Sequence, residues 1–148
     1  MSSLPEIFSP EGPLAQAIGG YRVRDQQLDM AERIAAAINS QAVFIAEAGT
    51  GTGKTFAYLV PALQSGGKVI VSTGTKTLQD QLFNKDLPMV RDALKAPVKI
   101  ALLKGRANYV CPYHLQHAIA DGRFLTREDA ADARRISVFA KTTQSGDK

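Results

Sequence analysis

The segment EAGTGTGKT, residues 47–55, is the most informative part of this chain. A bound phosphate chain needs backbone N–H groups that converge on it without obstruction by side chains. Gly49, Gly51 and Gly53 permit the tight turn that such a convergence requires. The segment therefore predicts a phosphate-binding loop, and a simple glycine-rich turn is the alternative.

Two side chains at the end of this loop add chemistry to it. The Lys54 ammonium can reach the β- and γ-phosphates of a nucleotide, and the Thr55 hydroxyl is placed to ligate Mg²⁺. The strict motif begins with Gly, whereas Ala48 occupies that position here. We expect Lys54 and Thr55 to be catalytic. The expected contacts to ATP and Mg²⁺ comprise Ala48, Gly49, Thr50, Gly51, Thr52, Gly53, Lys54, Thr55 and Phe56.

Segments on both sides of the loop alternate between strand and helix patterns. Short apolar runs predict buried strands, and apolar residues at helical spacing predict helices. Apolar strands separated by helices indicate a parallel sheet covered on both faces. The predicted fold class is therefore α/β: an incomplete P-loop NTPase parallel sheet with flanking helices, followed by a helical segment. The predicted strands are 42–46, 68–72 and 98–103, and the predicted helices are 25–40, 54–63 and 76–84.

The chain divides into three predicted parts. Residues 1–20 are rich in Pro and Gly and predict an extended segment that leads into the domain. Residues 21–105 contain the predicted sheet, and residues 106–148 contain two helical patterns. The second pattern begins with Thr126 and Asp129 at capping-box spacing.

Composition limits the class of protein. With 148 residues, of which 45% are hydrophobic and 22% charged, the chain has the size and composition of one ordinary soluble domain. Its net charge of +4 favours a polyanionic partner only mildly. The apolar runs are far shorter than the ~20 residues that span a bilayer, and the first residues lack the pattern of a secretory leader. We therefore expect a cytoplasmic protein with no membrane partner.

Four stretches together resemble one helicase family. They are residues 21–30, EAGTGTGKT, STGTKTLQDQL at 72–82 and LKGRANYVC at 103–111. They are similar to the start of DinG/YoaA-like ATP-dependent DNA helicases, in the XPD-like iron–sulfur branch of superfamily 2. The resemblance implies the amino-terminal part of a RecA-like motor that translocates on single-stranded DNA and unwinds duplexes, in DNA repair.

The resemblance also assigns an adenine site upstream of the loop. It implies that Tyr21, Arg24, Gln27 and Met30 hold the base, and a Gln amide can offer a donor and an acceptor to the adenine edge. From spacing alone, Arg24 and Gln27 could equally be ordinary residues at a helix start.

The stretch 72–82 resembles a segment that contacts the DNA backbone. Hydroxyls at Ser72, Thr73, Thr75 and Thr77 suit phosphate oxygens and carry no sequence information. The alternative is a turn between strand and helix that is capped by Thr.

Cys111 corresponds by resemblance to the first of four cysteines that hold a 4Fe–4S cluster. The resemblance implies that residues 106–148 begin an iron–sulfur-type helical insertion, and that the cluster exists in the full-length protein only. A lone cysteine could also be a core residue or a reactive thiol, and it cannot form an internal disulfide. His114 and His117 receive no role.

Hydrolysis requires acidic groups that this sequence does not display. An acidic residue on Mg²⁺ and a carboxylate that orients water are needed, and no DEAH-like box occurs in residues 1–148. We therefore expect the chain alone to bind nucleotide weakly, with little turnover. Two alternatives remain, another P-loop NTPase such as a nucleotide kinase, or a non-catalytic nucleotide- or DNA-binding module.

Overall fold

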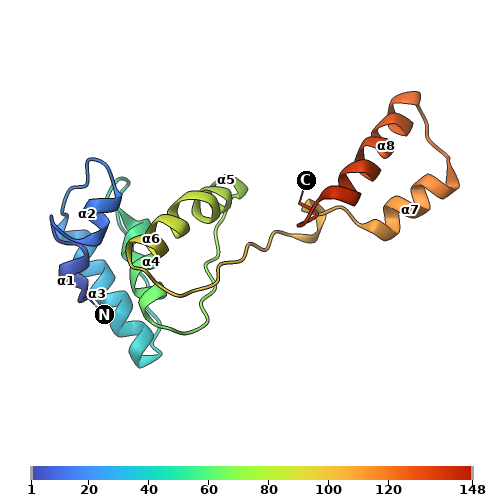
Figure 1. Ribbon diagram of the computed structural model, residues 1–148. Helices are drawn as coiled ribbons and strands as arrows, with labels where there is room; N and C mark the ends of the chain where they lie inside the picture. Colours follow the sequence, from blue (N-terminus) through green and yellow to red (C-terminus); the bar gives the residue numbers. More distant parts are fainter. Residues whose placement is uncertain (1, 148) are drawn as a thin grey trace. The chain divides into compact units, whose positions relative to one another are not determined.

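The computed structural model describes residues 2–147, in which the chain divides into two compact units (Figure 1). The first unit ends at Leu102 and the second begins at Leu103. No helix among the described residues is long and apolar enough to cross a membrane. The first unit contains α1 (Leu4–Ile7), α2 (Pro13–Ala17), α3 (Asp25–Ser40), α4 (Lys54–Gln64), α5 (Lys76–Gln81), the π-helix η1 (Leu82–Asp86) and α6 (Leu87–Ala93). The second contains the 3-10 helix η2 (Arg106–Asn108), α7 (Pro112–Asp121) and α8 (Arg127–Thr142).

The core of the first unit lies where α3 packs along α4. Leu59 and Val60 on α4 have no exposed surface, and Val90 on α6 is equally buried. Helices α1 and α2 close this core, since Ile7 and Leu14 are 1% and 0% exposed. Apolar contact therefore holds the helices of this unit around α4.

The structure of the first residues differs from the sequence prediction. Residues 1–20 were expected to be extended, whereas the described part forms α1 and α2. A capping box starts α1, in which the Ser3 side chain accepts from the Glu6 N–H and the Glu6 carboxylate accepts from the Ser3 N–H. Pro13 lies in the first turn of α2, where a missing N–H costs nothing. Ile7, Phe8 and Leu14 then gain burial that an extended path would not give.

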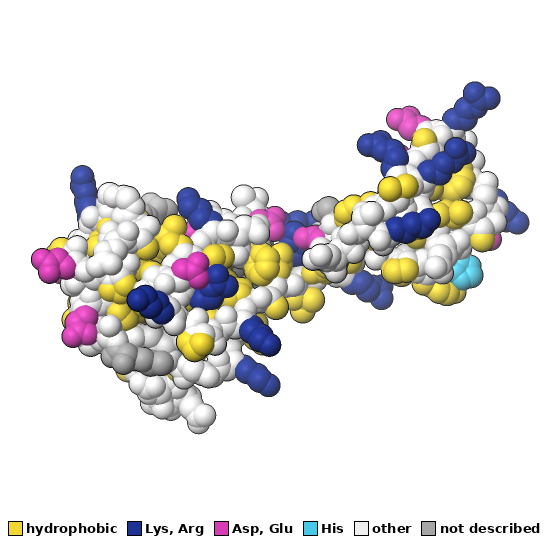
Figure 2. Space-filling model, viewed as in Figure 1, with side chains coloured by type: hydrophobic (Ala, Val, Ile, Leu, Met, Phe, Trp, Pro, Cys, Tyr) yellow, Lys and Arg dark blue, Asp and Glu magenta, His cyan; other side chains and the backbone are white. Residues whose placement is uncertain are grey.

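The predicted parallel sheet is wrong. Residues 42–46, 68–72 and 98–103 contain no strand, and the described residues hold only an isolated bridge between Tyr109 and Asp147. Val43, Ile45 and Ile70 are 92%, 91% and 94% exposed, and hydrophobic side chains are visible on the surface in Figure 2. The physical reason is that residues of high β-propensity give a segment only a local preference for the strand conformation. A strand also needs a hydrogen-bonding neighbour about 4.8 Å away. These three segments do not supply one another with that neighbour.

The helix predictions are confirmed. Helices α3 and α4 match the predicted 25–40 and 54–63, and α7 and α8 match the two patterns after residue 106. The Thr126 and Asp129 capping box forms as expected, with both backbone-to-side-chain distances at 3.0 Å. The predicted helix 76–84 is present as α5 and then widens into η1.

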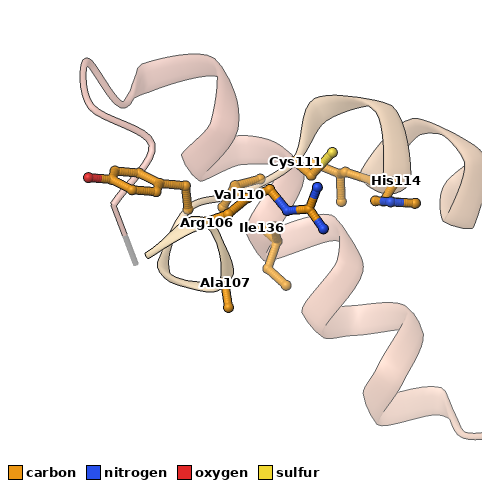
Figure 3. A pocket seen from close by; sticks show the side chains of 8 residues that line it. Arg106, Ala107, Val110, Cys111, His114 and Ile136 are labelled. Atoms are coloured by element: carbon orange, nitrogen blue, oxygen red, sulfur yellow. The ribbon is translucent and has the colours of Figure 1, made fainter. Parts of the chain in front are cut away.

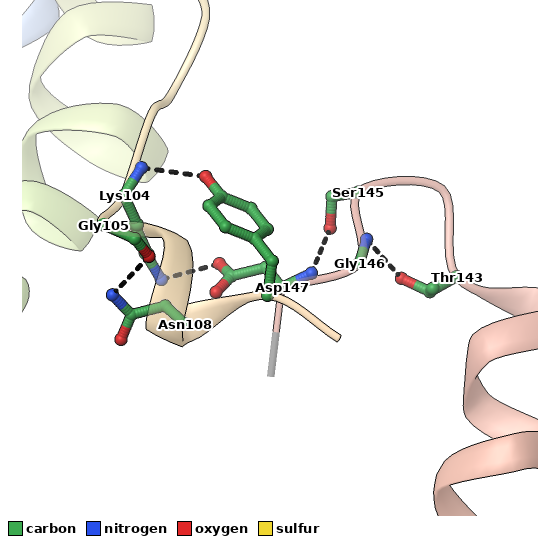
Figure 4. A network of polar contacts seen from close by, with 8 residues as sticks. Lys104, Gly105, Asn108, Thr143, Ser145, Gly146 and Asp147 are labelled. Carbon is green, nitrogen blue, oxygen red and sulfur yellow. Dashed lines mark hydrogen bonds and ion pairs between the residues drawn. The ribbon is translucent and has the colours of Figure 1, made fainter. Parts of the chain in front are cut away.

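The two ends of the second unit are tied together (Figure 4). Lys104 Nζ lies 2.6 Å from Asp147 Oδ2, and both side chains are largely buried. Tyr109 pairs with Asp147 as an antiparallel bridge, and its hydroxyl accepts from the Lys104 N–H at 2.8 Å. Val110 N–H donates to Gly146 O at 2.9 Å. This set of contacts, which we call the clasp, closes the unit around α7 and α8.

Replacing Leu59 with Ala should destabilise the first unit. The side chain is fully buried, so the change removes apolar contact and leaves a cavity, at a cost of about 2–5 kcal/mol in the free energy of unfolding. The matched control is Leu125→Ala, because Leu125 is 97% exposed. We expect this control to change stability by less than about 0.5 kcal/mol. Urea unfolding followed by circular dichroism measures both, and equal midpoints for the two variants would contradict the described core.

Candidate functional site

The glycine-rich loop ends at the first residue of α4. Gly51 and Gly53 have φ of +78° and +80°, in the left-handed region that favours glycine. Gly53 is also the N-cap of α4, and no side chain caps this helix. A helix N-terminus without a side-chain cap leaves its first N–H groups available to an anion.

The loop amides are available. From Gly49 to Thr55, no backbone N–H donates a hydrogen bond within residues 2–147. Free N–H groups cost little free energy while they face water. When residues of left-handed and right-handed backbone conformation alternate, their successive N–H groups form a concave site for negative charge. The loop thus has the geometry of an anion site.

The side chains of Lys54 and Thr52 donate hydrogen bonds to carbonyl oxygens at the start of the loop. Lys54 Nζ donates to Ala48 O at 2.6 Å and to Gly49 O at 2.8 Å. Thr52 Oγ1 donates to Gly49 O at 2.9 Å. The ammonium is therefore held over the start of the loop by carbonyl oxygens. An incoming phosphate would compete with these carbonyls for the same charge.

Gln27 fixes the loop to α3. Its side chain is 2% exposed, and Nε2 donates to Gly53 O at 2.8 Å. Gln27 Oε1 is buried without a hydrogen-bond partner in the described residues. A Cβ on Gly53 would lie 2.0 Å from Gln27 Nε2, so only glycine fits between the loop and this amide.

The other residues predicted for adenine lie near Gln27 in sequence but differ in exposure. Tyr21 is half-buried, its hydroxyl donates to Phe8 O at 3.0 Å, and burial raises the pKa of Tyr21 while the Arg24 charge opposes that rise. Arg24 is exposed at the N-cap of α3, and Met30 is half-buried against the core. Phe56 also packs against the core. Tyr21 and Arg24 are therefore neighbours, while Phe56 is occupied by packing.

Asp86 is a buried acidic residue that no sequence prediction named. Burial raises the pKa of Tyr58, the nearby Thr55 side chain lowers it, and the Asp86 charge raises it. Asp86 is 5% exposed, and Gln81 Nε2 donates to its Oδ2 at 3.1 Å. No motif marks these residues: Tyr58 occurs within the apolar stretch of α4, and Asp86 follows the polar pair Asn84 and Lys85, where an acid is expected at the surface.

The four hydroxyls predicted to contact DNA fall into two pairs. Thr73 Oγ1 donates to Thr75 O at 3.2 Å, and Thr75 Oγ1 accepts from the Leu78 N–H as the cap of α5. Ser72 and Thr77 are exposed, and their hydroxyls make no hydrogen bond within the described part of the chain. Two of the four hydroxyls thus organise the turn, and two remain available.

Cys111 lies in the second unit, at the N-cap of α7. Its side chain is exposed and borders a cavity of about 610 Å³ that Arg106, His114 and Ile136 also line (Figure 3). Among residues 2–147, no group of three or more His, Cys, Asp or Glu side chains could hold a metal ion. The residues present therefore do not form a four-ligand cluster site by themselves.

Comparison with known proteins gives consistent matches. The model of the DEAD/DEAH box helicase family matches residues 27–117. Over 99% of its length the chain is 49% identical to the ATP-dependent DNA helicase YoaA of Haemophilus influenzae, and over 97% it is 46% identical to YoaA of Escherichia coli. It is 37% identical to the ATP-dependent helicase DinG of Mycobacterium tuberculosis over 99% of its length. The chain spans 23%, 23% and 24% of these relatives, about a quarter of their length. No solved structure matches it.

Replacing Gly53 with Ala should destabilise the loop. The variant places a Cβ at positive φ and against Gln27 Nε2, and strain of this kind costs about 1–3 kcal/mol. Gly49→Ala is the control, since a Cβ there would meet only the Thr52 methyl group at 4.0 Å. Thermal unfolding should separate the two variants. A Gly53→Ala protein as stable as Gly49→Ala would show that the Gln27 contact does not constrain the loop.

Proposed function

The chain belongs to the DEAD/DEAH box helicase family, and from that premise we propose that it carries the ATP-binding loop of an ATP-dependent DNA helicase. The observation that carries this proposal is the row of free N–H groups from Gly49 to Thr55, at the uncapped start of α4. Charge from Lys54 and the helix N-terminus would stabilise a triphosphate there. The whole activity, ATP-driven movement along single-stranded DNA and duplex unwinding in repair, is proposed from the similarity to YoaA and DinG.

The nucleotide site has distinct proposed parts. Lys54 would neutralise the β- and γ-phosphates, and Thr55 would ligate Mg²⁺. Gln27 is suited to the adenine edge because its Oε1 is buried and unpartnered, and Tyr21 with Arg24 lies beside it in sequence. We propose nucleotide binding as the property of residues 1–148 to measure. No DEAH-like box, whose acidic residues hydrolysis requires, occurs among these residues.

The DNA segment is proposed on α5 and the turn before it. The exposed Ser72 and Thr77 hydroxyls suit phosphate oxygens, while Thr73 and Thr75 would hold the turn that presents them. Cys111 is proposed as one thiolate ligand of an iron–sulfur cluster, a kind of group that thiolates hold. The described residues provide no second thiolate beside it.

Lys54→Ala should weaken nucleotide binding. Hydrogen bonds to charged groups contribute about 1.5–3 kcal/mol, which corresponds to roughly 10- to 150-fold in affinity. Titration with a fluorescent ATP analogue and Mg²⁺ measures this, and Lys68→Ala, a change at an exposed lysine of the same unit, is the control. Equal affinity of the two variants would refute the proposed phosphate site.

A double replacement of Ser72 and Thr77 by Ala should weaken binding of a labelled oligothymidylate about tenfold, because two hydrogen bonds of about 0.5–1.5 kcal/mol each are lost. Fluorescence anisotropy at fixed salt measures the affinity, which should also fall as salt rises. Ser65→Ala is the control, since that hydroxyl donates to Ala62 O. Unchanged affinity in the double variant would exclude these hydroxyls from the DNA contact.

A further inference from the structure

A proline lies inside a continuous helix of the first unit. The backbone is right-handed helical at Gln81 and Leu82 and again at Asp86 and Leu87, so α5, η1 and α6 follow one another without a break. Pro88 lies in the first turn of α6, and therefore in the interior of this longer helix. In an α-helix, a proline at such a position lacks the N–H for the carbonyl four residues earlier, and its ring clashes with that carbonyl.

The π-helix η1 accommodates this proline. Leu87 N–H donates to Leu82 O, which is five residues earlier and not four. The wider turn separates the proline ring from the preceding carbonyls, so the chain stays helical where a proline usually kinks or ends a helix. Pro88 therefore gives a physical reason for η1, which is a rare conformation.

The two halves of the long helix are held differently. Helix α6 packs against α2 and α4, and its residue Val90 has no exposed surface. Leu82 and Asp86 of η1 are buried as well. Helix α5, all of whose residues the structure describes, contains no buried residue. The core therefore fixes α6 and η1, and the direction in which the side chains of α5 point follows from the π-turn.

A π-turn changes that direction by about 100°. Each residue of an α-helix advances the chain by about 100° around the helix axis. A turn closed by i→i+5 hydrogen bonds contains one residue more than an α-helical turn, so the residues before it are rotated by one such step relative to an unbroken α-helix. Thr77 on α5 is exposed in the observed orientation. At a radius of about 5–6 Å, the rotation displaces such a side chain by roughly 8 Å.

A side-chain hydrogen bond across the turn depends on the same geometry. Gln81 Nε2 donates to Asp86 Oδ2 at 3.1 Å. Residues five apart in an α-helix point roughly 140° away from each other, whereas the wider π-turn brings the fifth residue back toward the first. Asp86 is 5% exposed, and a buried carboxylate needs polar groups that compensate its charge. The bond from Gln81 therefore opposes closure of the π-turn into an α-helix.

We propose that Pro88 and Asp86 are positioning residues for the DNA contact, because the π-turn that they maintain rotates α5 so that the Thr77 hydroxyl faces the bound strand. This inference rests on the proposed function, since it assumes that α5 contacts DNA. It goes further by naming side chains outside the contact that determine its orientation.

A matched pair of variants separates rotation from simple damage. Pro88→Ala restores the N–H and removes the ring, so the helix can close as an α-helix, and α5 then rotates by about 100°. The second variant adds deletion of the exposed Asn84 to Pro88→Ala. Leu87 then lies four residues after Leu82, so the same backbone hydrogen bond is α-helical and the rotation is cancelled. A change that only damages the helix would be made worse by the deletion and not reversed.

The rotation is measured by pulsed electron paramagnetic resonance between nitroxide labels. The labels are attached at Thr77→Cys on α5 and at Glu32→Cys, an exposed position on α3, with Cys111 replaced by Ser. Pro88→Ala should shift the distance between the labels by several ångströms, within the displacement of roughly 8 Å given above. The added deletion should return the distance to within about 2 Å of the starting value, since one helical residue contributes about 1.5 Å.

The DNA contact is measured with the unlabelled proteins by fluorescence anisotropy of an oligothymidylate. Pro88→Ala should weaken binding about 2- to 13-fold, the equivalent of one hydrogen bond of about 0.5–1.5 kcal/mol. Deletion of Asn84 from that variant should restore the wild-type affinity. Proline is the least favourable residue inside a helix, so Pro88→Ala should fold, and Pro88→Ser offers a second replacement that also restores the N–H.

The outcomes distinguish this inference from the proposed function. A Pro88→Ala protein with unchanged label distance, or with wild-type affinity for the oligothymidylate, overturns the inference and leaves the proposed DNA contact intact. An affinity that the deletion lowers further has the same meaning. A wild type that does not bind the oligothymidylate overturns both.

Discussion

The hydrogen bond between the Gln27 amide and Gly53 O holds the glycine-rich loop where α4 begins. It joins α3 to the residue whose positive φ turns the chain into α4, and the packing of α3 on α4 forms the core of the first unit. The loop can therefore expose a row of unpaired N–H groups without collapsing onto itself. Because Gln27 is almost fully buried, the position of the loop depends on the core and not on contacts with solvent.

The sequence predicted the local features of several helices well. Helix boundaries near Asp25 and Lys54, and the cap at Thr126, follow from short-range patterns that need no distant partner. The loop glycines are equally local, since Gly51 and Gly53 have positive φ, a conformation that glycine adopts readily and other residues rarely adopt. The assignments of individual side chains to ATP, DNA and a cluster stay predictions.

The sheet could not be predicted in the same way. Runs such as 42–46 and 68–72 have the composition of buried strands, but pairing depends on which segment lies alongside, and composition does not contain that information. The buried Asp86 was missed for a related reason. Its hydrogen bond with Gln81 forms across the wider turn of a π-helix, and no local pattern in the sequence marks residues 81 and 86 as partners.

The exposed apolar runs also have a consequence for the molecule in solution. Val43, Ile45 and Ile70 are exposed and belong to no strand, and exposed apolar stretches of high β-propensity can template pairing between molecules. Short segments of high β-propensity and little charge are the ones most prone to aggregation. These exposed residues therefore favour association between molecules, and the net charge of +4 opposes it.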